Sequence, residues 1–258
     1  PVAFVATLAM TFLVAVVIGA ICVRLKEIYF AFVTLAFQML IHSTILSWQS
    51  LTGGDQGLRG GIPRPPFLGI DLSNHLHLYI TSCALLVIGL LLMRQIAQSP
   101  FGYTLRMIRD NPTRASFLGV NVVRMKLGVF VLAVTMASMA GIIMALFVSG
   151  AFPEFGFWTT SGEAIFMIML GGTQVFLGPV IGAFLLQLLN HYVTIYTHHH
   201  GLVLGILILA IVLGLRRGVA DYVADWISER RRAAAPLGRE EGAETAPPTP
   251  PAARKMVG

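Results

Sequence analysis

Long apolar runs alternate with short polar segments along this chain, and the pattern predicts an all-α membrane protein. Several runs reach the roughly 20 residues that a helix needs to cross the hydrocarbon core of a bilayer. The expected spans are 1–23, 28–48, 78–93, 127–149 and 202–215, with a longer apolar stretch at 164–194. Because the runs are continuously apolar, a transmembrane β-barrel is excluded. We expect a polytopic transmembrane helix bundle over residues 1–220, in which the chain begins inside an apolar run and further spans precede Pro1.

Charged residues assign the two sides of the membrane. Only 12% of the 258 residues are charged, about half the share of a soluble domain, and the net charge is +6. Basic residues concentrate in the 24–27 turn, in the segment 99–126 and after Leu215, which places these parts in the cytoplasm and does not indicate nucleic-acid binding. The charge-balanced loop 50–77 and the acidic, aromatic loop 151–163 fit the outer side.

The apolar stretch 164–194 conflicts with this assignment if it crosses once, because the basic residues after Leu215 would then lie outside. Four helix-breaking residues interrupt it: Gly171, Gly172, Gly178 and Pro179. We expect a broken or re-entrant helical hairpin, in which two helical segments enter the membrane and return to the same side. Farther on, residues 221–232 form an amphipathic stretch at the inner lipid interface, and the tail to residue 258 is disordered.

The segment 99–126 is polar and strongly basic between two apolar runs. Its charged residues are Arg106, Arg109, Asp110, Arg114, Arg124 and Lys126. Capping signals predict two short helices, the first opened by Ser99 and Pro100, the second opened by Asn111 and Pro112 and closed by Gly119. An ordered loop of this length indicates a docking element for a cytoplasmic partner. The alternative is that its arginines serve only the positive-inside rule and lipid headgroups.

Polar side chains inside the spans are few. Thr34, Gln38 and His42 recur every fourth residue and share one helix face, where they either hold helices together by hydrogen bonds or line a pathway. The cysteines Cys22 and Cys83 lie in apolar spans and are predicted to be free. Small residues at four-residue spacing along 133–149 predict close helix packing.

The groups that energy coupling or catalysis would need are missing. The sequence has no Gly-Lys pair for a nucleotide-binding P-loop and no metalloprotease motif, and the adjacent histidines 198–200 would diverge around a helix rather than form a metal site. The spans contain no Asp, Glu, Lys or Arg for proton coupling, although sodium coupling stays open. We therefore expect no enzyme activity in this chain and an energy source on another chain.

Four segments carry a family resemblance: YFAFVTLAFQM (29–39), TGGDQGLRGGIP (52–63), residues 99–130 and MIMLGGTQVFLGPVIGAF (167–184). In this order they resemble the LivM-type permeases of branched-chain amino acid ABC transporters, over most of residues 24–218. The resemblance implies a multi-pass protein of the bacterial inner membrane that translocates leucine, isoleucine and valine. It also implies a LivH-like permease partner, a periplasmic amino-acid-binding protein and two cytoplasmic ATPase subunits, which would bind ATP and Mg²⁺; this chain would hold no cofactor.

By this resemblance, the segment 99–126 corresponds to the coupling helices that dock on the ATPases. The expected coupling residues are Leu105, Ile108, Arg109, Pro112, Arg114, Ala115 and Gly119. Leu105 and Ile108 would offer an apolar contact for the partner's groove. The segment departs from the Glu-Ala-Ala pattern of many ABC permeases, since Arg114, Ala115 and Ser116 stand there without a Glu.

The substrate path is predicted from hydroxyls, amides and free backbone, which suit the charged ends of a zwitterion. The candidates are Thr34, Gln38, Thr52, Gly53, Gly54, Gly171 and Gly172. Urea or short amides are an alternative substrate class within the family. A stand-alone channel or ion-coupled carrier is the alternative from a different class, and it would work without any ATPase.

Overall fold

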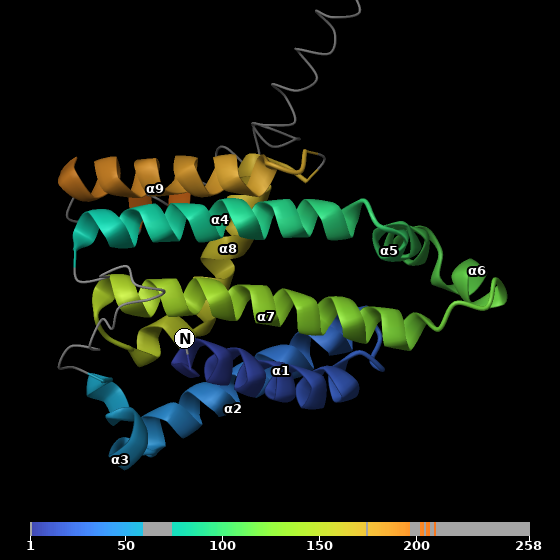
Figure 1. Ribbon diagram of the computed structural model, residues 1–258, viewed down its shortest axis with the longest axis horizontal. Coiled ribbons are helices and arrows are strands. Elements are labelled where there is room, and N and C mark those ends of the chain that lie inside the picture. The colour runs from blue at the N-terminus through green and yellow to red at the C-terminus, as the bar shows by residue number, and fades with distance from the viewer. Residues whose placement is uncertain are drawn as a thin grey trace, which may run out of the picture. The chain divides into compact units, whose positions relative to one another are not determined.

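The computed structural model describes residues 2–58, 74–173 and 175–196, together with positions 202, 203, 205, 206 and 209. Within these residues the chain is helical and contains no β-strand, which confirms the all-α prediction (Figure 1). The elements are α1 (Val2–Cys22), α2 (Glu27–Ser47), α3 (Gln49–Thr52), η1 (Gly54–Gln56), α4 (His75–Ala97), α5 (Pro100–Asp110), α6 (Pro112–Phe117), α7 (Val122–Val148), η2 (Pro153–Gly156), α8 (Trp158–Gly171) and α9 (Gly178–Tyr196).

Five of these helices are long and apolar enough to cross a membrane: α1, α2, α4, α7 and α9. The first four correspond to predicted spans, but α4 and α7 extend beyond the apolar runs toward the basic segment. Hydropathy reports where a helix meets hydrocarbon, whereas capping groups decide where it starts. Asn121 starts α7 five residues before the predicted span, because its side-chain oxygen accepts a hydrogen bond of 3.0 Å from the Arg124 N–H.

The chain divides into two compact units, residues 1–163 and 164–258, with α8 running from one to the other. In the first unit, α1 packs along α7 through a face of small residues that includes Ala15, Gly19 and Cys22. A Cβ at Gly19 would lie only 2.7 Å from Cδ1 of Phe130, so the glycine allows this close approach. The small residues of α7 predicted to form a packing face do not take part in this contact. Ala133, Ala137 and Gly141 are exposed among the described residues.

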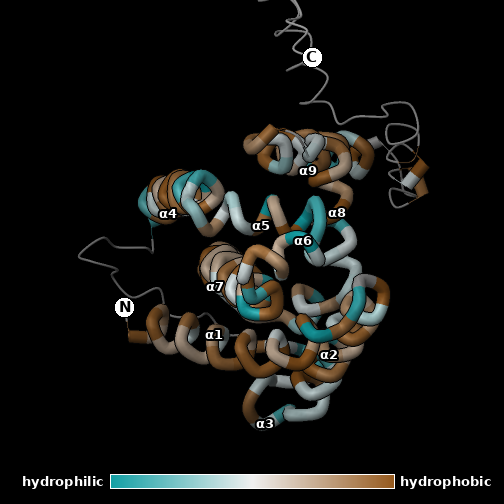
Figure 2. The backbone as a smooth tube through the Cα atoms, turned by 90° about the vertical axis from the view of Figure 1, so that its right-hand side faces the viewer, coloured by the Kyte–Doolittle hydropathy of each residue, from teal (hydrophilic) through white to brown (hydrophobic). Residues whose placement is uncertain are grey.

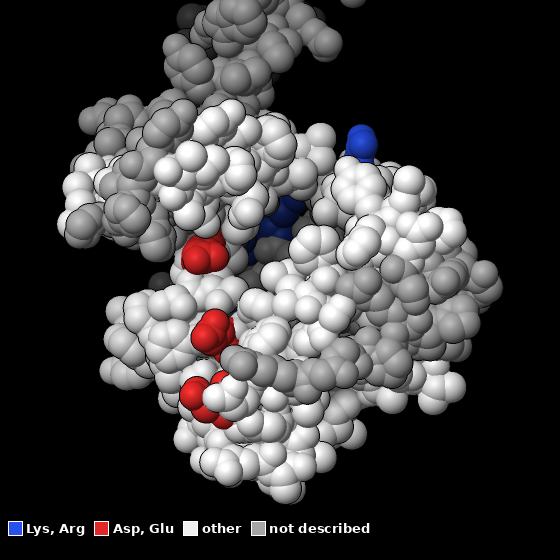
Figure 3. Space-filling model, turned by 90° about the vertical axis from the view of Figure 1, so that its left-hand side faces the viewer, with Lys and Arg blue, Asp and Glu red and all other residues white. Residues whose placement is uncertain are grey.

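Opposite charges occupy the two ends of this unit. The helices α5 and α6 lie at the end where α4 finishes and α7 begins, and Figure 2 shows hydrophilic residues (teal) along them. At the other end, Asp55 in η1 and Glu154 in η2 lie on elements that contact each other. Figure 3 shows acidic side chains on this opposite face. This polarity agrees with the predicted sides of the membrane.

The predicted break in 164–194 is present in the second unit, because α8 ends at Gly171 and α9 starts at Gly178. The buried side chains of Leu170 and Leu186 pack together next to this turn. That the two segments return to the same side of a membrane stays a prediction. The histidines 198–200, most of the predicted span 202–215 and the segment 221–258 lie outside the described residues.

Candidate functional site

The two short helices of the basic segment are held by their ends, although one predicted cap is wrong. Ser99 precedes α5, but its side chain accepts no N–H of that helix; the hydroxyl instead donates a hydrogen bond of 2.6 Å to the Ile96 carbonyl at the end of α4. Asn111 caps α6 as predicted, accepting a hydrogen bond of 2.9 Å from the Arg114 N–H. Gly119 has φ +84° and, with Val120, returns two N–H groups to the last turn of α6.

The structure corrects the apolar contact predicted for α5. Ile108 is only 6% exposed, so its side chain packs inside the protein, and Leu105 is half-buried. The reason is that α5 is amphipathic and turns its apolar face toward α4 and α7. Ala115 on α6 is fully buried as well. Arg109 is exposed, and its guanidinium lies 3.4 Å from Asp110, a surface ion pair that contributes little to stability.

Two large apolar side chains at the end of α6 are strongly exposed instead. Phe117 is 86% and Leu118 is 68% exposed, and we name this pair the α6 tip. Pro112 and Arg114 are exposed on the same helix. Sequence reasoning missed the α6 tip, although one signal was available. Two large apolar residues stand directly before the helix-ending Gly119, after the run Pro-Thr-Arg-Ala-Ser, which has no large apolar residue.

Three of the predicted path residues, Thr52, Gly53 and Gly54, come together in one turn after α2. The Thr52 hydroxyl donates to the carbonyls of Ile45 and Trp48 and accepts from the Gly54 N–H at 3.3 Å. Gly53 and Gly54 have φ of +76° and +59°, which glycine adopts without strain. The Thr52 hydroxyl therefore holds this turn together, and the turn pairs with the loop after α7 through the Leu58 N–H and the Ala151 carbonyl.

Gln38 makes a contact between helices. Its side-chain amide donates to the Gly156 carbonyl at 3.3 Å and to the Ser161 hydroxyl at 3.2 Å, at the start of α8. One turn farther along α2, the His42 ring lies 5.2 Å from the ring of Phe157. Among the described residues, the Thr34 hydroxyl bonds within its own helix, to the Phe30 and Ala31 carbonyls. Of the two roles left open for this face, Gln38 performs the hydrogen bonding between helices in this structure.

The remaining path candidates, Gly171 and Gly172, belong to the turn between α8 and α9 and are described within the second unit. Gly172 has φ +101°, and its N–H donates to the Ile168 carbonyl at 2.8 Å. Gly171 lies against the backbone of Gly178 and Gly182, leaving no space for a Cβ. Gly171 thus has a packing role, and Gly172 supplies the positive φ of the turn.

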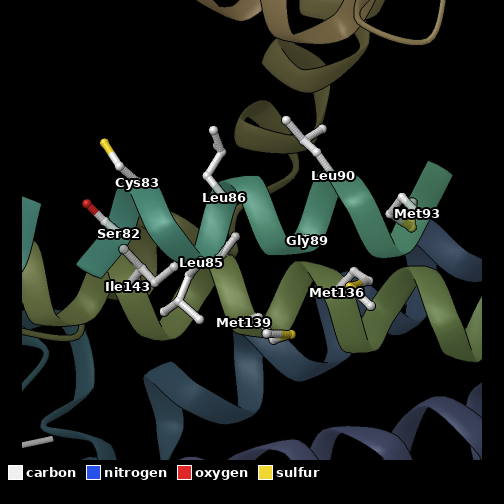
Figure 4. Close-up of a pocket in the computed structure, with 11 residues that line it drawn as sticks. Ser82, Cys83, Leu85, Leu86, Gly89, Leu90, Met93, Met136, Met139 and Ile143 are labelled. Atoms are coloured by element: carbon white, nitrogen blue, oxygen red, sulfur yellow. The ribbon is translucent and has the colours of Figure 1, made fainter. Parts of the chain in front are cut away.

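An open apolar groove of about 430 Å³ runs between α4 and α7 (Figure 4). Its lining includes Leu85, Gly89 and Met93 from α4 and Met136, Met139 and Ile143 from α7. None of the predicted path residues lines it. No cluster of three or more potential metal ligands occurs in the part of the chain that the structure describes.

Known proteins similar to this chain give the context for these features. The family model of the permease component of branched-chain amino acid transport systems matches residues 1–212. Two curated relatives are the high-affinity branched-chain amino acid transport system permease proteins LivM of Salmonella typhimurium (strain LT2) and Escherichia coli (strain K12). Each is 23% identical over 225 residues, which cover 78% of this chain and 53% of the relative. No solved structure matches.

The chain spans about half the length of the curated relatives it matches. The five apolar helices in the described part of the chain, together with its family, make it a multi-pass protein of the inner membrane. The resemblance to LivM that four sequence segments indicate is confirmed. The family match extends over most of the chain, from the first helix through α9. The chain belongs to the family of permease components of branched-chain amino acid transport systems.

Proposed function

We propose that this chain is the permease subunit of an ABC importer that translocates leucine, isoleucine and valine across the bacterial inner membrane. A periplasmic amino-acid-binding protein delivers the substrate, a LivH-like permease completes the pathway, and two ATPase subunits bind ATP and Mg²⁺ in the cytoplasm. The family match over residues 1–212 is the observation that carries this proposal. The chain itself supplies a route and a docking element, and it binds no cofactor.

The docking element is α6 together with the exposed end of α5. A six-residue helix is too short to be stable by itself, so its caps at Asn111 and Gly119 are what hold its shape. The α6 tip, at 86% and 68% exposure, supplies the apolar contact that Ile108 does not. Arg109 on α5 and Arg114 on α6 are exposed, and their positive charge suits an acidic rim on the partner groove.

The substrate path follows the polar face of α2. The Gln38 amide and the Ser161 hydroxyl are hydrogen-bonded to each other at 3.2 Å. When the helices separate, this bond breaks, and both groups can then bind the ammonium or carboxylate of a zwitterion. Apolar walls suit the aliphatic side chain. The Thr52 turn shapes the end of α2 on this path, and Gly171 and Gly172 remain path candidates within the second unit.

Reconstitution in liposomes tests the proposed function. The chain with its partner permease, ATPases and binding protein should take up leucine only when ATP is present on the ATPase side, and isoleucine and valine should compete. The chain alone should show no uptake. Uptake without an ATPase would overturn the proposal in favour of a stand-alone carrier, and competition by urea but not by valine would reassign the substrate.

Copurification with the ATPases tests the docking element. Replacing the α6 tip by Phe117→Ala and Leu118→Ala should reduce the bound ATPase about tenfold or more, because exposed apolar anchors dominate such contacts. Val123→Ala removes another exposed apolar side chain at the same end of the protein and is the matched control. Unchanged ATPase binding in the double variant, with weaker binding to anionic lipid vesicles, would assign the tip to the membrane surface instead.

A further inference from the structure

The helix α5 is fastened to the end of α4. The Arg106 guanidinium lies over the Tyr103 ring, 5.2 Å from its centroid, and Nη2 of Arg106 donates to the Ala97 carbonyl at 3.1 Å. Ala97 is the last residue of α4, so this bond satisfies a carbonyl that the helix itself leaves free. The Arg106 side chain of α5 thereby binds the C-terminal end of α4 across the turn at Ser99.

Gly102 allows the two helices to touch at this point. A Cβ on Gly102 would lie 2.7 Å from the Ile96 carbonyl oxygen and 2.6 Å from the Ala97 carbonyl carbon. Both are backbone atoms, which cannot move aside as a side chain can. Gly102 is buried, and α5 therefore crosses the end of α4 in direct backbone contact. We name Gly102 and Arg106 together the α4–α5 clamp.

The same short helix also contacts α7. The Phe101 ring lies 3.5 Å from the position that a Cβ on Gly128 would occupy, near the start of α7. The exposed end of α5 leads directly into α6, and α6 packs on both α5 and α7. A force on α6 therefore reaches the end of α4 through α5, and it reaches the start of α7 both through α5 and directly.

Beyond this joint, α4 and α7 have room to change their separation. They bound the apolar groove of about 430 Å³, into which Leu85 of α4 points toward α7 (Figure 4). Met93, Met136 and Met139 line the groove. Methionine side chains are unbranched and repack at low cost, so the groove can widen or narrow without a large loss of packing.

We propose that the α4–α5 clamp is the transmission joint of this permease: Gly102 and Arg106 are positioning residues that convert a movement of α5 and α6 into a change of the α4–α7 separation. The proposal rests on the proposed function, because it takes the ATPases as the source of the movement. Arg106 differs in this from the other arginines of the segment. Its guanidinium is bound to the end of a transmembrane helix, whereas that of Arg109 pairs only with its neighbour Asp110.

The test measures leucine uptake and ATP hydrolysis together in the complete reconstituted complex. Arg106→Ala should leave the subunits assembled and hydrolysing ATP, while uptake per ATP falls about fivefold or more, the low end of the range for coupling between two sites. Arg106→Lys keeps a donor for the Ala97 carbonyl and should restore part of the coupling. Lys26→Ala removes an exposed positive charge from the α1–α2 turn and should not change uptake per ATP.

A distance measurement reports the movement itself. Spin labels attached to the native, exposed Cys83 on α4 and to Met144→Cys on α7 should change their separation when a non-hydrolysable ATP analogue binds. Arg106→Ala should abolish that change. Gly102→Ala, whose Cβ would push α5 off α4, should abolish it too.

Unchanged uptake per ATP in Arg106→Ala would overturn the clamp, and so would loss of subunit assembly, which indicates a purely structural role. Failure of the unsubstituted complex to assemble with ATPases would instead overturn the proposed function. The two failures are therefore distinguishable in the same set of measurements.

Discussion

Three glycines, Gly171, Gly178 and Gly182, let α8 and α9 approach until their backbones touch. A Cβ on Gly182 would lie 2.7 Å from the Gly171 nitrogen and 2.9 Å from the Met167 carbonyl carbon. Without a hydrophobic driving force between helices in lipid, such close packing is a main source of association. At the residue scale, this turn is therefore specified by the absence of side chains.

Gly182→Ala should destabilise the protein by about 2–3 kcal/mol, the upper part of the range for overpacking, because the obstructing atoms belong to the backbone. Thermal unfolding in detergent, followed by circular dichroism, measures the change. Gly162→Ala is the matched control within α8, since a Cβ there meets nothing within 4 Å. It should be neutral or stabilise by up to about 1 kcal/mol through helix propensity. Equal effects of the two substitutions would contradict the close contact.

The Gln38–Ser161 contact can be tested as a pair. Gln38→Ala and Ser161→Ala should each lower stability, and the double variant should lose less than the sum, with a coupling energy of about 0.6 kcal/mol for a hydrogen bond between membrane helices. A pathway role for Gln38 adds a second effect: a higher KM for leucine uptake in Gln38→Ala. A coupling energy of zero would show that the 3.2 Å contact does not hold α2 to α8.

At the element scale, capping residues at the helix ends, rather than an apolar surface, determine where the helices of the basic segment begin and end. The sequence predicts α6 from Asn111, Pro112 and Gly119, and the structure has it because a cap and a glycine stop are local interactions. Ser99 shows the limit of this reasoning. Its hydroxyl donates to the Ile96 carbonyl and does not accept an N–H of α5, which a pattern of residue types does not reveal.

Asn111→Ala should increase the fraction of time that α6 is locally unfolded. The cap contributes about 1 kcal/mol, so hydrogen exchange of the α6 amides should speed up about fivefold. Asn121→Ala is the matched control, because Asn121 makes the same kind of cap, at 3.0 Å, on the 27-residue α7. There the faster exchange should stay within the first turn. Unchanged exchange in α6 would mean that packing against α5 and α7, and not the cap, maintains this helix.

Burial of individual side chains was harder to predict than helix positions. Periodicity shows that α5 has two faces, but the face that packs inward depends on how α5 crosses the ends of α4 and α7. At that crossing Gly102 and Arg106 contact the end of α4, and the apolar periodicity of α5 reveals neither contact. Ile108, predicted as part of the apolar contact, is buried, and the α6 tip, for which there was no prediction from the sequence, is exposed.

At the scale of the whole molecule, charge polarity and helix breaks determine how the chain is threaded. Basic residues predict the cytoplasmic end, and the first unit places Asp55 and Glu154 on elements at the opposite end. The break at Gly171–Gly178 is also present. The return of α9 to the outer side follows only from counting crossings, so it calls for a direct experiment.

Labelling of single cysteines with a membrane-impermeant thiol reagent tests this threading. In a Cys83→Ala background, with Cys22 fully buried, Glu154→Cys and Thr194→Cys should react in intact cells. Thr113→Cys, on the exposed surface of α6, should react only after the membrane is made permeable. The physical reason is that two crossings separate Glu154 from Thr194 if α8 and α9 form a hairpin, and an even number of crossings returns the chain to the side it left. Labelling of Thr194→Cys only in permeabilised cells would mean that residues 164–194 cross once, and the basic residues after Leu215 would then have to lie outside, against the positive-inside rule.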